Sequence, residues 1–396
     1  MILLDLSHTS HTQARTGIQR VSRSLHAGLG ATAEAITHDP YLRTWRRLAP
    51  WERENLAANG SAAVKRGAQW PWSARFTGKW RRKLGWGSAL PLRLPEDATG
   101  LIVPEFFSPA VGTALPELRR QVRGPAIAVF HDAIALRLPE LTPLKTVARY
   151  PGYLQELLQF DGIAATTDDT RDTLVDYWKW LGVEDPPPVV AIRLGVDPLP
   201  AGIAAPLPGD LREPTILAVG SIEGRKNHAA LLEAAESLWA EGRKFRLHLI
   251  GSAVPETAAP ALARIKALQS AGRPLRYDGP VDDAALHAAY AGSAFTVYPS
   301  VMEGFGIPVI ESLAHGRPCL CSGRGALGES ARGGGCVPLE SVDAASLAAA
   351  IGTLLAAPEK IATLAGEARR RTFPTWADYT RGITDWLGTL PRRDLA

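Results

Sequence analysis

Short apolar runs alternate with stretches of helical periodicity through most of this 396-residue chain. In the C-terminal half, strands are expected at 215–219, 246–250, 275–277, 295–298, 318–321 and 336–339. Helical patterns separate these runs, near 228–241, 284–291, 307–315 and 344–356. Alternation of this kind predicts an α/β domain in which a parallel, doubly wound sheet is covered by helices.

The N-terminal half shows the same alternation less regularly. It begins with a strand pattern at 2–5 and a helix pattern at 17–29, followed by strands at 101–103 and 127–130 and a helical stretch at 144–158. Between the halves, residues 198–214 are dense in proline and glycine and lack periodicity, which is typical of a linker. We therefore expect an N-terminal domain at 1–197, a linker at 198–214 and a C-terminal domain at 215–374.

Two glutamates, Glu303 and Glu311, flank a glycine turn at the start of an expected helix. A helix starting near Gly306 directs unpartnered backbone N–H groups at whatever lies before it, and such a terminus binds phosphate. Gly304 and Gly306 let the main chain approach a ligand closely. Because carboxylates repel phosphate, hydroxyl groups are the natural partners of the two glutamates. The pattern predicts a site for a nucleotide sugar.

The run from Glu303 to Glu311, Glu-Gly-Phe-Gly-Ile-Pro-Val-Ile-Glu, resembles the E-x7-E motif of the retaining glycosyltransferases of family 4. The run Ala218-Val-Gly-Ser-Ile-Glu-Gly-Arg-Lys-Asn227 resembles the strand, glycine loop and basic pair of the same family. The similarity extends over roughly 160–375 by motif matching. It implies the GT-B fold, in which two doubly wound Rossmann-like domains face an interdomain cleft, with residues 375–396 crossing back to the N-terminal domain.

The resemblance also implies roles for individual residues. Lys226 and Arg225 would hold the donor diphosphate and stabilise it as it departs. Glu311 would accept hydrogen bonds from the ribose hydroxyls, and Glu303 would face the donor hexose. The main chain of the glycine turn would line the same site through Gly304, Phe305, Gly306 and Ile307.

Four further positions complete the expected site. Ser221 stands where many family members carry an arginine, so that one phosphate contact is either missing or supplied by Arg225. Val281 follows a glycine-proline turn where the nucleotide base would stack. Gly17 would let the chain approach the diphosphate, and His131 would lie beside the donor sugar, in a segment that resembles bacterial polysaccharide mannosyl and rhamnosyl transferases. We expect His131, Glu303, Lys226 and Arg225 to be the catalytic residues.

The expected activity is transfer of a sugar, with retention, from a nucleoside-diphosphate sugar to a glycan or lipid-linked acceptor in surface polysaccharide biosynthesis. GDP-mannose is the favoured donor, ahead of dTDP-rhamnose and UDP-sugars. The donor is a substrate, so no cofactor is expected, and the chain contains no Asp-x-Asp pair for a metal-bound diphosphate. Two alternatives stay open, a nucleotide-sugar epimerase on the GT-B fold and an inactive scaffold or binding protein.

A basic, tryptophan-rich insertion occupies about residues 41–93. It holds twelve of the chain's Lys and Arg residues against two glutamates, and six of its eleven tryptophans. Indole rings and cations together suit an anionic membrane surface. The insertion could equally pack its aromatic residues on the N-terminal domain, and nucleic acid binding lacks any recognition motif.

The three cysteines, Cys319, Cys321 and Cys336, lack the spacing of a zinc site and fall in expected strands, which predicts small core residues and no metal. Apolar runs stay well short of the roughly 20 residues needed to span a bilayer. The expected location is therefore cytoplasmic, with peripheral association at the inner face of the membrane as the sharper possibility.

Overall fold

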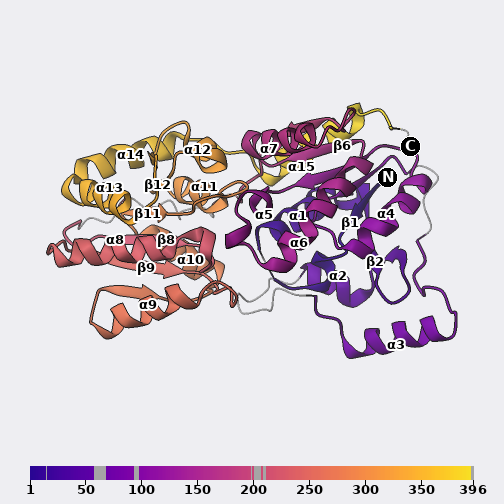
Figure 1. The fold of residues 1–396 in the computed structure, drawn as a ribbon, viewed down its shortest axis with the longest axis horizontal. Helices are drawn as coiled ribbons and strands as arrows, with labels where there is room; N and C mark the ends of the chain where they lie inside the picture. Colours follow the sequence, from indigo (N-terminus) through magenta and orange to yellow (C-terminus); the bar gives the residue numbers. More distant parts are fainter. Residues whose placement is uncertain are drawn as a thin grey trace. The chain divides into compact units, whose positions relative to one another are not determined.

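The computed structural model describes residues 1–14, 16–57, 68–92, 98–197, 199, 207 and 211–393. The chain divides into two compact units, which are described separately below (Figure 1). Unit 1 comprises Met1–Asp132, Lys145–Gly195 and Trp376–Ala396, and unit 2 comprises Ala133–Leu144 and Val196–Thr375. The expected linker at 198–214 lies for the most part outside the described residues.

One boundary differs from the sequence expectation. Residues 133–144 fall within the expected N-terminal domain, but the structure groups Ala133–Leu144 with unit 2. Leu141 of this segment lies next to Gly224 of unit 2: a Cβ added at Gly224 would be 3.3 Å from the Leu141 side chain. This segment, which includes the short helix α5 (Ile134–Arg137), therefore packs beside a loop of unit 2.

Unit 1 is built on a seven-stranded sheet with the order β3-β2-β1-β4-β5-β6-β7. Its strands are β1 (Ile2–Asp5), β2 (Ala33–Asp39), β3 (Thr44–Arg47), β4 (Gly100–Val103), β5 (Ala126–Phe130), β6 (Gly162–Ala165) and β7 (Val189–Ala191). Neighbouring strands are parallel except for β2 and β3. Strands β4, β5 and β6 are buried throughout, as continuous apolar runs predict. The strand order reverses between β1 and β4, which is the topological switch point of this sheet.

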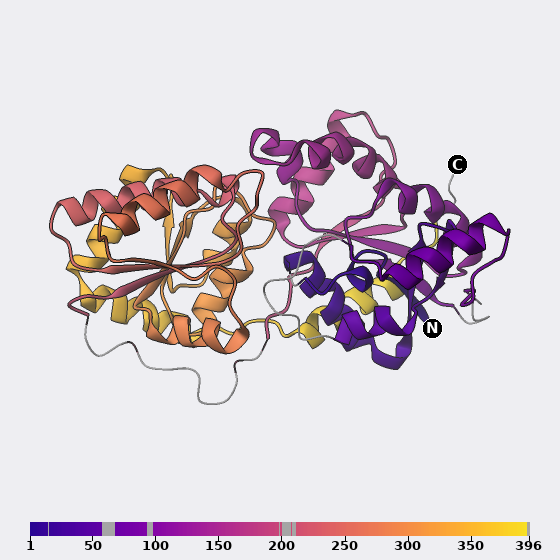
Figure 2. The ribbon, with the colours of Figure 1, turned by 90° about the horizontal axis from the view of Figure 1, so that it is seen from below.

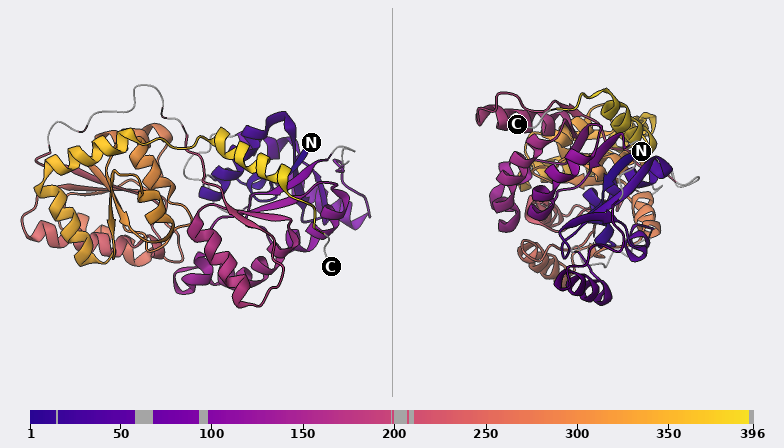
Figure 3. Two further views of the ribbon diagram at one scale, coloured as in Figure 1. Left: turned by 90° about the horizontal axis from the view of Figure 1, so that it is seen from above. Right: turned by 90° about the vertical axis from the view of Figure 1, so that its right-hand side faces the viewer.

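The described part of unit 1 also contains α-helices. They are α1 (Gly17–Leu29), α2 (Pro50–Ala57), α3 (Trp72–Lys83), α4 (Pro109–Gln121), α6 (Leu144–Glu156), α7 (Asp168–Trp180) and α15 (Trp376–Thr389). Thr16 and Gln19 form a capping box that starts α1 directly after the first loop. Helix α15 lies against α1, where a Cβ at Gly28 would clash with Thr380. The last helix of the chain is therefore part of unit 1 (Figure 3).

Unit 2 is built on a six-stranded, fully parallel sheet with the order β10-β9-β8-β11-β12-β13. Its strands are β8 (Thr215–Val219), β9 (Arg246–Ile250), β10 (Leu275–Tyr277), β11 (Phe295–Tyr298), β12 (Cys319–Ser322) and β13 (Cys336–Leu339). Here the order reverses between β8 and β11. Open α/β sheets bind ligands outside the carboxyl ends of their strands at such a reversal.

Helices cover both faces of the unit 2 sheet (Figure 2). They are α8 (His228–Ala240), α9 (Ala259–Ser270), α10 (Asp283–Gly292), α11 (Ile307–Ala314), α12 (Gly325–Ala331), α13 (Ala344–Ala356) and α14 (Pro358–Arg370). Alternate residues of a strand enter different cores: Ile216 packs in the cluster that contains α8, α9 and α13, and Leu217 packs in the cluster with α10. The predicted doubly wound α/β fold is confirmed.

The basic insertion at about 41–93 has two parts with different surroundings, the residues before α3 and α3 itself. Its stretch 58–67 lies outside the described residues. In the first part, Trp45 is buried, and Arg46 is ion-paired with Glu52 at 2.7 Å in the interior of unit 1. Two more aromatic rings pack together there, those of Trp51 and Trp70. Packing on the N-terminal domain is therefore correct for this part, whereas α3 is largely exposed.

Among the described residues, no single helix has both the length and the apolar character to cross a membrane. One bent pair, α13 with α14, meets the criterion only when the two helices are joined across an angle of 98°. Both helices contribute buried side chains to unit 2, including Leu347 and Ile361.

Candidate active site

The loop after β8 carries the two cations expected to bind a diphosphate. Gly224–Lys226 forms a single 3-10 turn directly before α8. Asn227 links the turn to the helix with φ 54°, a left-handed conformation that asparagine adopts more readily than most residues. Its side-chain amide donates to the Val342 carbonyl at 2.8 Å. This anchored turn fixes the position of Lys226, which is only 8% exposed.

The loop after β11 carries Glu303 and ends at the N-terminus of α11. Gly306 precedes the helix with φ 92°, and a Cβ there would lie 2.9 Å from the side chain of Leu327. Both the conformation and the lack of space therefore require glycine. Pro308 lies in the first helical turn, where its missing N–H removes no hydrogen bond. The main chain of 304–307 thus leads into the positive end of the helix dipole.

Arg225, Lys226 and Glu303 form one ion-paired cluster at the switch point between β8 and β11. The two carboxylate oxygens of Glu303 accept separately, one from Lys226 Nζ and the other from Arg225 at 2.6 Å. Arg225 also contacts Glu223 at 2.9 Å, and the Ser221 hydroxyl donates to the same Glu223 oxygen at 2.8 Å. Ser221 therefore joins the cluster through a carboxylate that was not among the expected site residues.

Glu303 is fully ionised at neutral pH. Burial alone would raise the pKa of its carboxyl group, but the charges of Arg225 and Lys226 and the hydrogen bond from Lys226 together lower it to about 2. A group with so low a pKa cannot act as a general acid. Its charge is also shared with two cations, which weakens it as a nucleophile. The arrangement suits a fixed carboxylate that accepts hydrogen bonds.

Acid should weaken the folded state partly through Glu303. Its folded pKa lies below the ordinary value of 4.5, so the ionised form stabilises the fold above that pH, and this contribution is lost as the pH falls from 4.5 to about 2. The shift corresponds to about 3 kcal/mol. In urea denaturation from about pH 6 to about pH 2.5, Glu303→Gln should begin less stable than the wild type and lose less stability on acidification. Parallel pH curves for the two proteins would contradict the ion-pair description.

Glu311 lies inside α11, and its carboxylate accepts a hydrogen bond from an aromatic hydroxyl. The Tyr290 hydroxyl donates to Glu311 Oε2 at 3.3 Å and lies 3.3 Å from the Tyr298 hydroxyl. Burial and the charge of Glu311 raise the pKa of the Tyr290 hydroxyl, which keeps it protonated as a donor. One turn later, His315 hydrogen-bonds the Glu311 carbonyl at 2.7 Å. The carboxylate is therefore positioned by Tyr290 of α10, whose hydroxyl in turn contacts Tyr298 of β11.

Removing the Tyr290 hydroxyl should loosen Glu311 without removing its charge. In Tyr290→Phe, we expect the KM for a nucleotide-sugar donor to rise about tenfold while kcat stays close to the wild-type value, since one hydrogen bond to a charged group is lost. Steady-state kinetics with varied donor would measure this split. Tyr379→Phe is the matched control, because the hydroxyl of Tyr379 is buried in unit 1 without a hydrogen-bond partner. Equal KM values for wild type and Tyr290→Phe would argue against a positioning role.

Val281 lies close to the same network. It follows the Gly279 turn, with φ 65°, and packs in the apolar cluster that contains Tyr290. Its side chain therefore forms part of an apolar wall behind the residues that hold Glu311. This surface is compatible with the base contact that the resemblance implies, which stays a prediction.

The two expected site residues of unit 1 occupy different elements. Gly17 is the exposed first residue of α1. His131 follows β5, where its Nε2–H donates to the Pro104 carbonyl at 2.6 Å, an assignment that leaves Nδ1 as the acceptor nitrogen. Burial lowers the pKa of His131, although the hydrogen bond to Pro104 and the charge of Asp132 oppose the effect. His131 is therefore a neutral imidazole at neutral pH.

Two acidic residues at the switch point of unit 1 were not among the site residues expected from the sequence. Glu105 is buried just after β4 and accepts the backbone N–H groups of His8 and Thr9, each at 2.8 Å. Asp5 ends β1, and burial together with the charge of Glu105 raises its pKa to about 7. The sequence offered one sign of them, because each of these acids lies at the end of an apolar strand run, where site residues are expected.

The three cysteines lie closer together than their spacing indicates. Cys319 and Cys321 share one face of β12, and Cys336 pairs with Cys319 from the adjacent strand β13. Their three sulfur atoms lie within 4.8 Å of one another, a ligand set that suits soft metal ions. Cys319 and Cys321 are fully buried and Cys336 is half-buried, so the prediction of core residues is confirmed for the first two.

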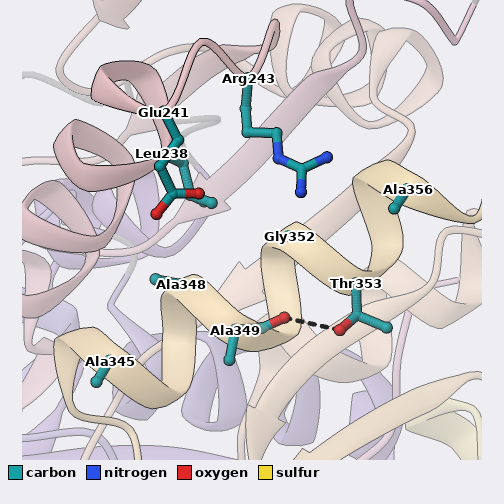
Figure 4. A pocket seen from close by; sticks show the side chains of 9 residues that line it. All are labelled: Leu238, Glu241, Arg243, Ala345, Ala348, Ala349, Gly352, Thr353 and Ala356. Atoms are coloured by element: carbon teal, nitrogen blue, oxygen red, sulfur yellow. Dashed lines mark hydrogen bonds between the residues drawn. The ribbon is translucent and has the colours of Figure 1, made fainter.

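A surface pocket lies between α8 and α13, away from the ion cluster (Figure 4). It is lined mainly by alanines and small residues, with Glu241 and Arg243 at its edge. It begins at Leu238, ten residues after the start of α8, which places it about 15 Å along the helix from the Lys226 turn. The pocket carries no group that could act on a phosphate and a sugar together, so it is not part of the candidate site.

The fold and the switch-point residues define a class. Two doubly wound α/β units, one with a cation-rich loop and a glycine-initiated helix at its switch point, have the arrangement of the GT-B fold. Solved structures with the same fold include sucrose-phosphate synthase from Thermosynechococcus elongatus, with a TM-score of 0.63, 19% identity and 97% of each chain covered. HepE from Anabaena, in complex with UDP and glucose, has a TM-score of 0.66 and 14% identity, covering 98% of this chain and 99% of that chain.

Sequence comparisons add to the structural ones. Residues 213–357 match the family described as Glycosyl transferases group 1, so the chain carries a domain of that family and the motif resemblance is confirmed. The serotype-specific mannosyltransferase WbdA of Escherichia coli is 25% identical over 342 residues, which cover 81% of this chain and 38% of that protein. The O-antigen chain mannosyltransferase B of Escherichia coli is 29% identical over 205 residues, covering 50% of this chain and 52% of the relative. The chain therefore spans less than two fifths of the length of WbdA.

Proposed function

We propose that this chain is a retaining glycosyltransferase that moves a sugar from a nucleoside-diphosphate sugar to a hydroxyl group of a glycan or lipid-linked acceptor in surface polysaccharide biosynthesis. The observation that carries the proposal is the ion-paired cluster of Arg225, Lys226 and Glu303 beside the N-terminus of α11, inside a glycosyl transferases group 1 domain. Cations and a helix N-terminus suit a diphosphate, and a fixed carboxylate suits sugar hydroxyls.

The cluster keeps capacity for a ligand. An ammonium group has three N–H donors, and the Lys226 ammonium donates one of them to Glu303. When a diphosphate binds, Lys226 can bridge it to the carboxylate, so that the cation serves both groups at once. Glu303 then accepts from the hexose and Glu311 from the ribose. The role of His131 beside the donor sugar stays a prediction.

The proposed reaction needs no covalent enzyme intermediate. The bond between the anomeric carbon and the phosphate oxygen breaks as the acceptor oxygen bonds to the same face of that carbon. The departing phosphate oxygen takes the proton of the acceptor hydroxyl, and Lys226 and Arg225 stabilise its developing charge. Because Glu303 is ionised and shared by two cations, the nucleophilic carboxylate of a double displacement is the less favourable assignment.

Mannose is the proposed donor sugar and GDP-mannose the proposed donor, because two Escherichia coli relatives are named mannosyltransferases. We propose that Lys226, Arg225 and the α11 dipole supply the positive charge, without a metal ion. The protein would work at the cytoplasmic face of the membrane as a peripheral protein.

The test is a turnover assay with purified protein, a panel of nucleotide sugars and extracts of lipid-linked and glycan acceptors, with and without EDTA. We expect nucleoside diphosphate release that depends on the acceptor, is fastest with GDP-mannose and is unchanged by EDTA. NMR of the product should show the anomeric configuration of the donor. An inverted product would overturn retention, donor conversion without acceptor would show an epimerase, and no turnover of any donor would support a scaffold.

A further inference from the structure

Helix α3 presents a row of large aromatic side chains to solvent. Trp72 is 77% exposed, Phe76 is 50% exposed and Trp80 is 53% exposed. The rings of Trp72 and Phe76 are stacked with centroids 5.3 Å apart, and those of Phe76 and Trp80 are tilted with centroids 6.2 Å apart. Aromatic side chains stabilise a protein most when they are buried, so a contiguous exposed row of three indicates a surface that binds a partner molecule or a membrane.

The opposite side of α3 fixes the helix to unit 1. Residues two positions apart on a helix point in nearly opposite directions, and the residues two positions after Trp72 and Phe76 are Ala74, which is half-buried, and Gly78, which is buried. A Cβ at Gly78 would lie 3.0 Å from the side chain of Tyr41. The aromatic row therefore points away from unit 1, at whose edge α3 lies (Figure 1).

The charge around the aromatic row has a single sign. Residues 68–92 contain five cations and no acidic residue. All five lie in α3, at Arg75, Lys79, Arg81, Arg82 and Lys83. Beyond the end of the helix, Leu84 and Trp86 continue the exposed apolar surface. Arg81 lies nine residues after Trp72, on the side of α3 that faces unit 1, and donates to the Gly87 carbonyl at 3.0 Å. The other four cations lie on or beside the outward surface of the aromatic row, and residues 68–92 contribute no carboxylate there.

We propose that α3 docks the protein on an anionic lipid bilayer. Indole rings settle at the headgroup level of a membrane, and lysine and arginine are attracted to anionic lipids near its surface. A short amphipathic helix with aromatic residues on its outward face and cations beside them lies in the plane of such an interface. The charge complementarity favours a bilayer over a protein partner, because the surface offers four cations beside an aromatic row and residues 68–92 contain no acidic side chain. This surface belongs to unit 1 and the ion cluster belongs to unit 2, so the inference uses none of the residues of the proposed reaction.

Vesicle co-sedimentation of the full chain would test the proposal. Wild-type protein should bind vesicles of phosphatidylcholine with phosphatidylglycerol far more tightly than vesicles of phosphatidylcholine alone, and high salt should weaken the binding. A charge variant, Arg75→Glu with Lys79→Glu and Arg82→Glu, should lower the partition coefficient by about 100-fold, since each cation contributes severalfold. An aromatic variant, Trp72→Ala with Phe76→Ala and Trp80→Ala, should lower it by at least about tenfold.

Matched controls lie elsewhere on the chain. Leu144, Trp180 and Leu181 are exposed apolar residues outside α3, and replacing all three with alanine should leave vesicle binding unchanged. Replacing the exposed lysines Lys145, Lys244 and Lys266 with glutamate changes the net charge as much as the charge variant does and should have little effect. Urea denaturation of each variant would confirm that unit 1 stays folded.

Two outcomes would overturn the proposal. In the first, both α3 variants bind anionic vesicles as tightly as the wild type. In the second, the control charge variant loses as much binding as the α3 charge variant, which would show general attraction of a basic protein. Nucleotide-dependent thermal stabilisation, measured in parallel, should be the same in the wild type and both α3 variants. A failure of membrane docking can thereby be distinguished from a failure of nucleotide binding.

Discussion

Lys226→Ala is expected to lower kcat/KM for the donor by about 1000-fold, toward the upper end of the loss seen when one preorganised charge-stabilising group is removed. The nearly buried ammonium lies beside Glu303, and its loss leaves that carboxylate with Arg225 as the remaining cation of the cluster. The carboxylate would then repel the incoming diphosphate, which in the wild type shares Lys226 with it. Steady-state kinetics and calorimetric titration of nucleoside diphosphate would measure both losses.

The control for this variant is Lys244→Ala, which removes an exposed lysine of the same unit. It should leave kcat/KM and nucleotide affinity unchanged. Because Lys226 also supports the fold through its ion pair, the urea midpoint of Lys226→Ala has to be measured alongside the kinetics. A folded Lys226→Ala protein with kcat/KM within about threefold of the wild type would contradict the role given to this lysine.

Glu311→Gln is expected to lower kcat/KM by about 100-fold, mainly through KM for the donor. Hydrogen bonds between hydroxyls and a charged carboxylate contribute about 1.5 to 3 kcal/mol each, and the neutral amide offers one acceptor in place of two. The Tyr290 hydroxyl can still donate to the amide oxygen, so that α11 and α10 keep their contact. The change is therefore local to the ligand side of the residue.

Deoxyribose donors provide a thermodynamic cycle for Glu311. With wild-type protein, loss of the ribose hydroxyls should weaken the donor by about 100-fold, whereas Glu311→Gln should discriminate only a few-fold between ribose and deoxyribose donors. Full additivity of the two changes would show that Glu311 does not contact the ribose. The cycle is independent of the identity of the sugar and the acceptor.

Local signals made much of unit 2 predictable. Alternating and continuous apolar runs predicted the bounds of its six strands to within about one residue. The start of α11 was predictable because Gly306 needs a positive φ and Pro308 suits a first turn, and both requirements are set by neighbours in sequence. The positions of Lys226 and Glu303 at strand ends followed from the same runs, since parallel strands end at one edge of a sheet.

Contacts between distant segments were not predictable in the same way. Arg225 and Glu303 are 78 residues apart, and their ion pair depends on β8 and β11 being adjacent. The Tyr290 contact with Glu311 likewise requires α10 and α11 to lie on the same face of the sheet. The proximity of the cysteine sulfur atoms depends on the register of β12 with β13, which their spacing does not reveal.

The basic insertion shows a different limit. Trp45 and Trp80 lie in stretches of similar composition, yet the first is buried in unit 1 and the second is half exposed. The difference lies in their contacts. Strand β3, which holds Trp45, pairs with β2, and Arg46 beside it is ion-paired with two carboxylates. Helix α3 contacts the rest of unit 1 through its face of small residues. Composition alone could not decide between packing and docking because both occur in the one segment.

Thermal unfolding of the wild type and Lys226→Ala with nucleoside, nucleoside monophosphate and nucleoside diphosphate tests the central claim most directly. A ligand that binds only the folded state raises the melting temperature, and at a fixed ligand concentration a tighter ligand raises it more. We predict that the diphosphate raises the melting temperature of the wild type by several degrees, far more than the nucleoside does, and that Lys226→Ala loses this difference. Equal stabilisation of both proteins by the diphosphate, or none of either, would contradict a diphosphate site at the junction of β8, β11 and α11.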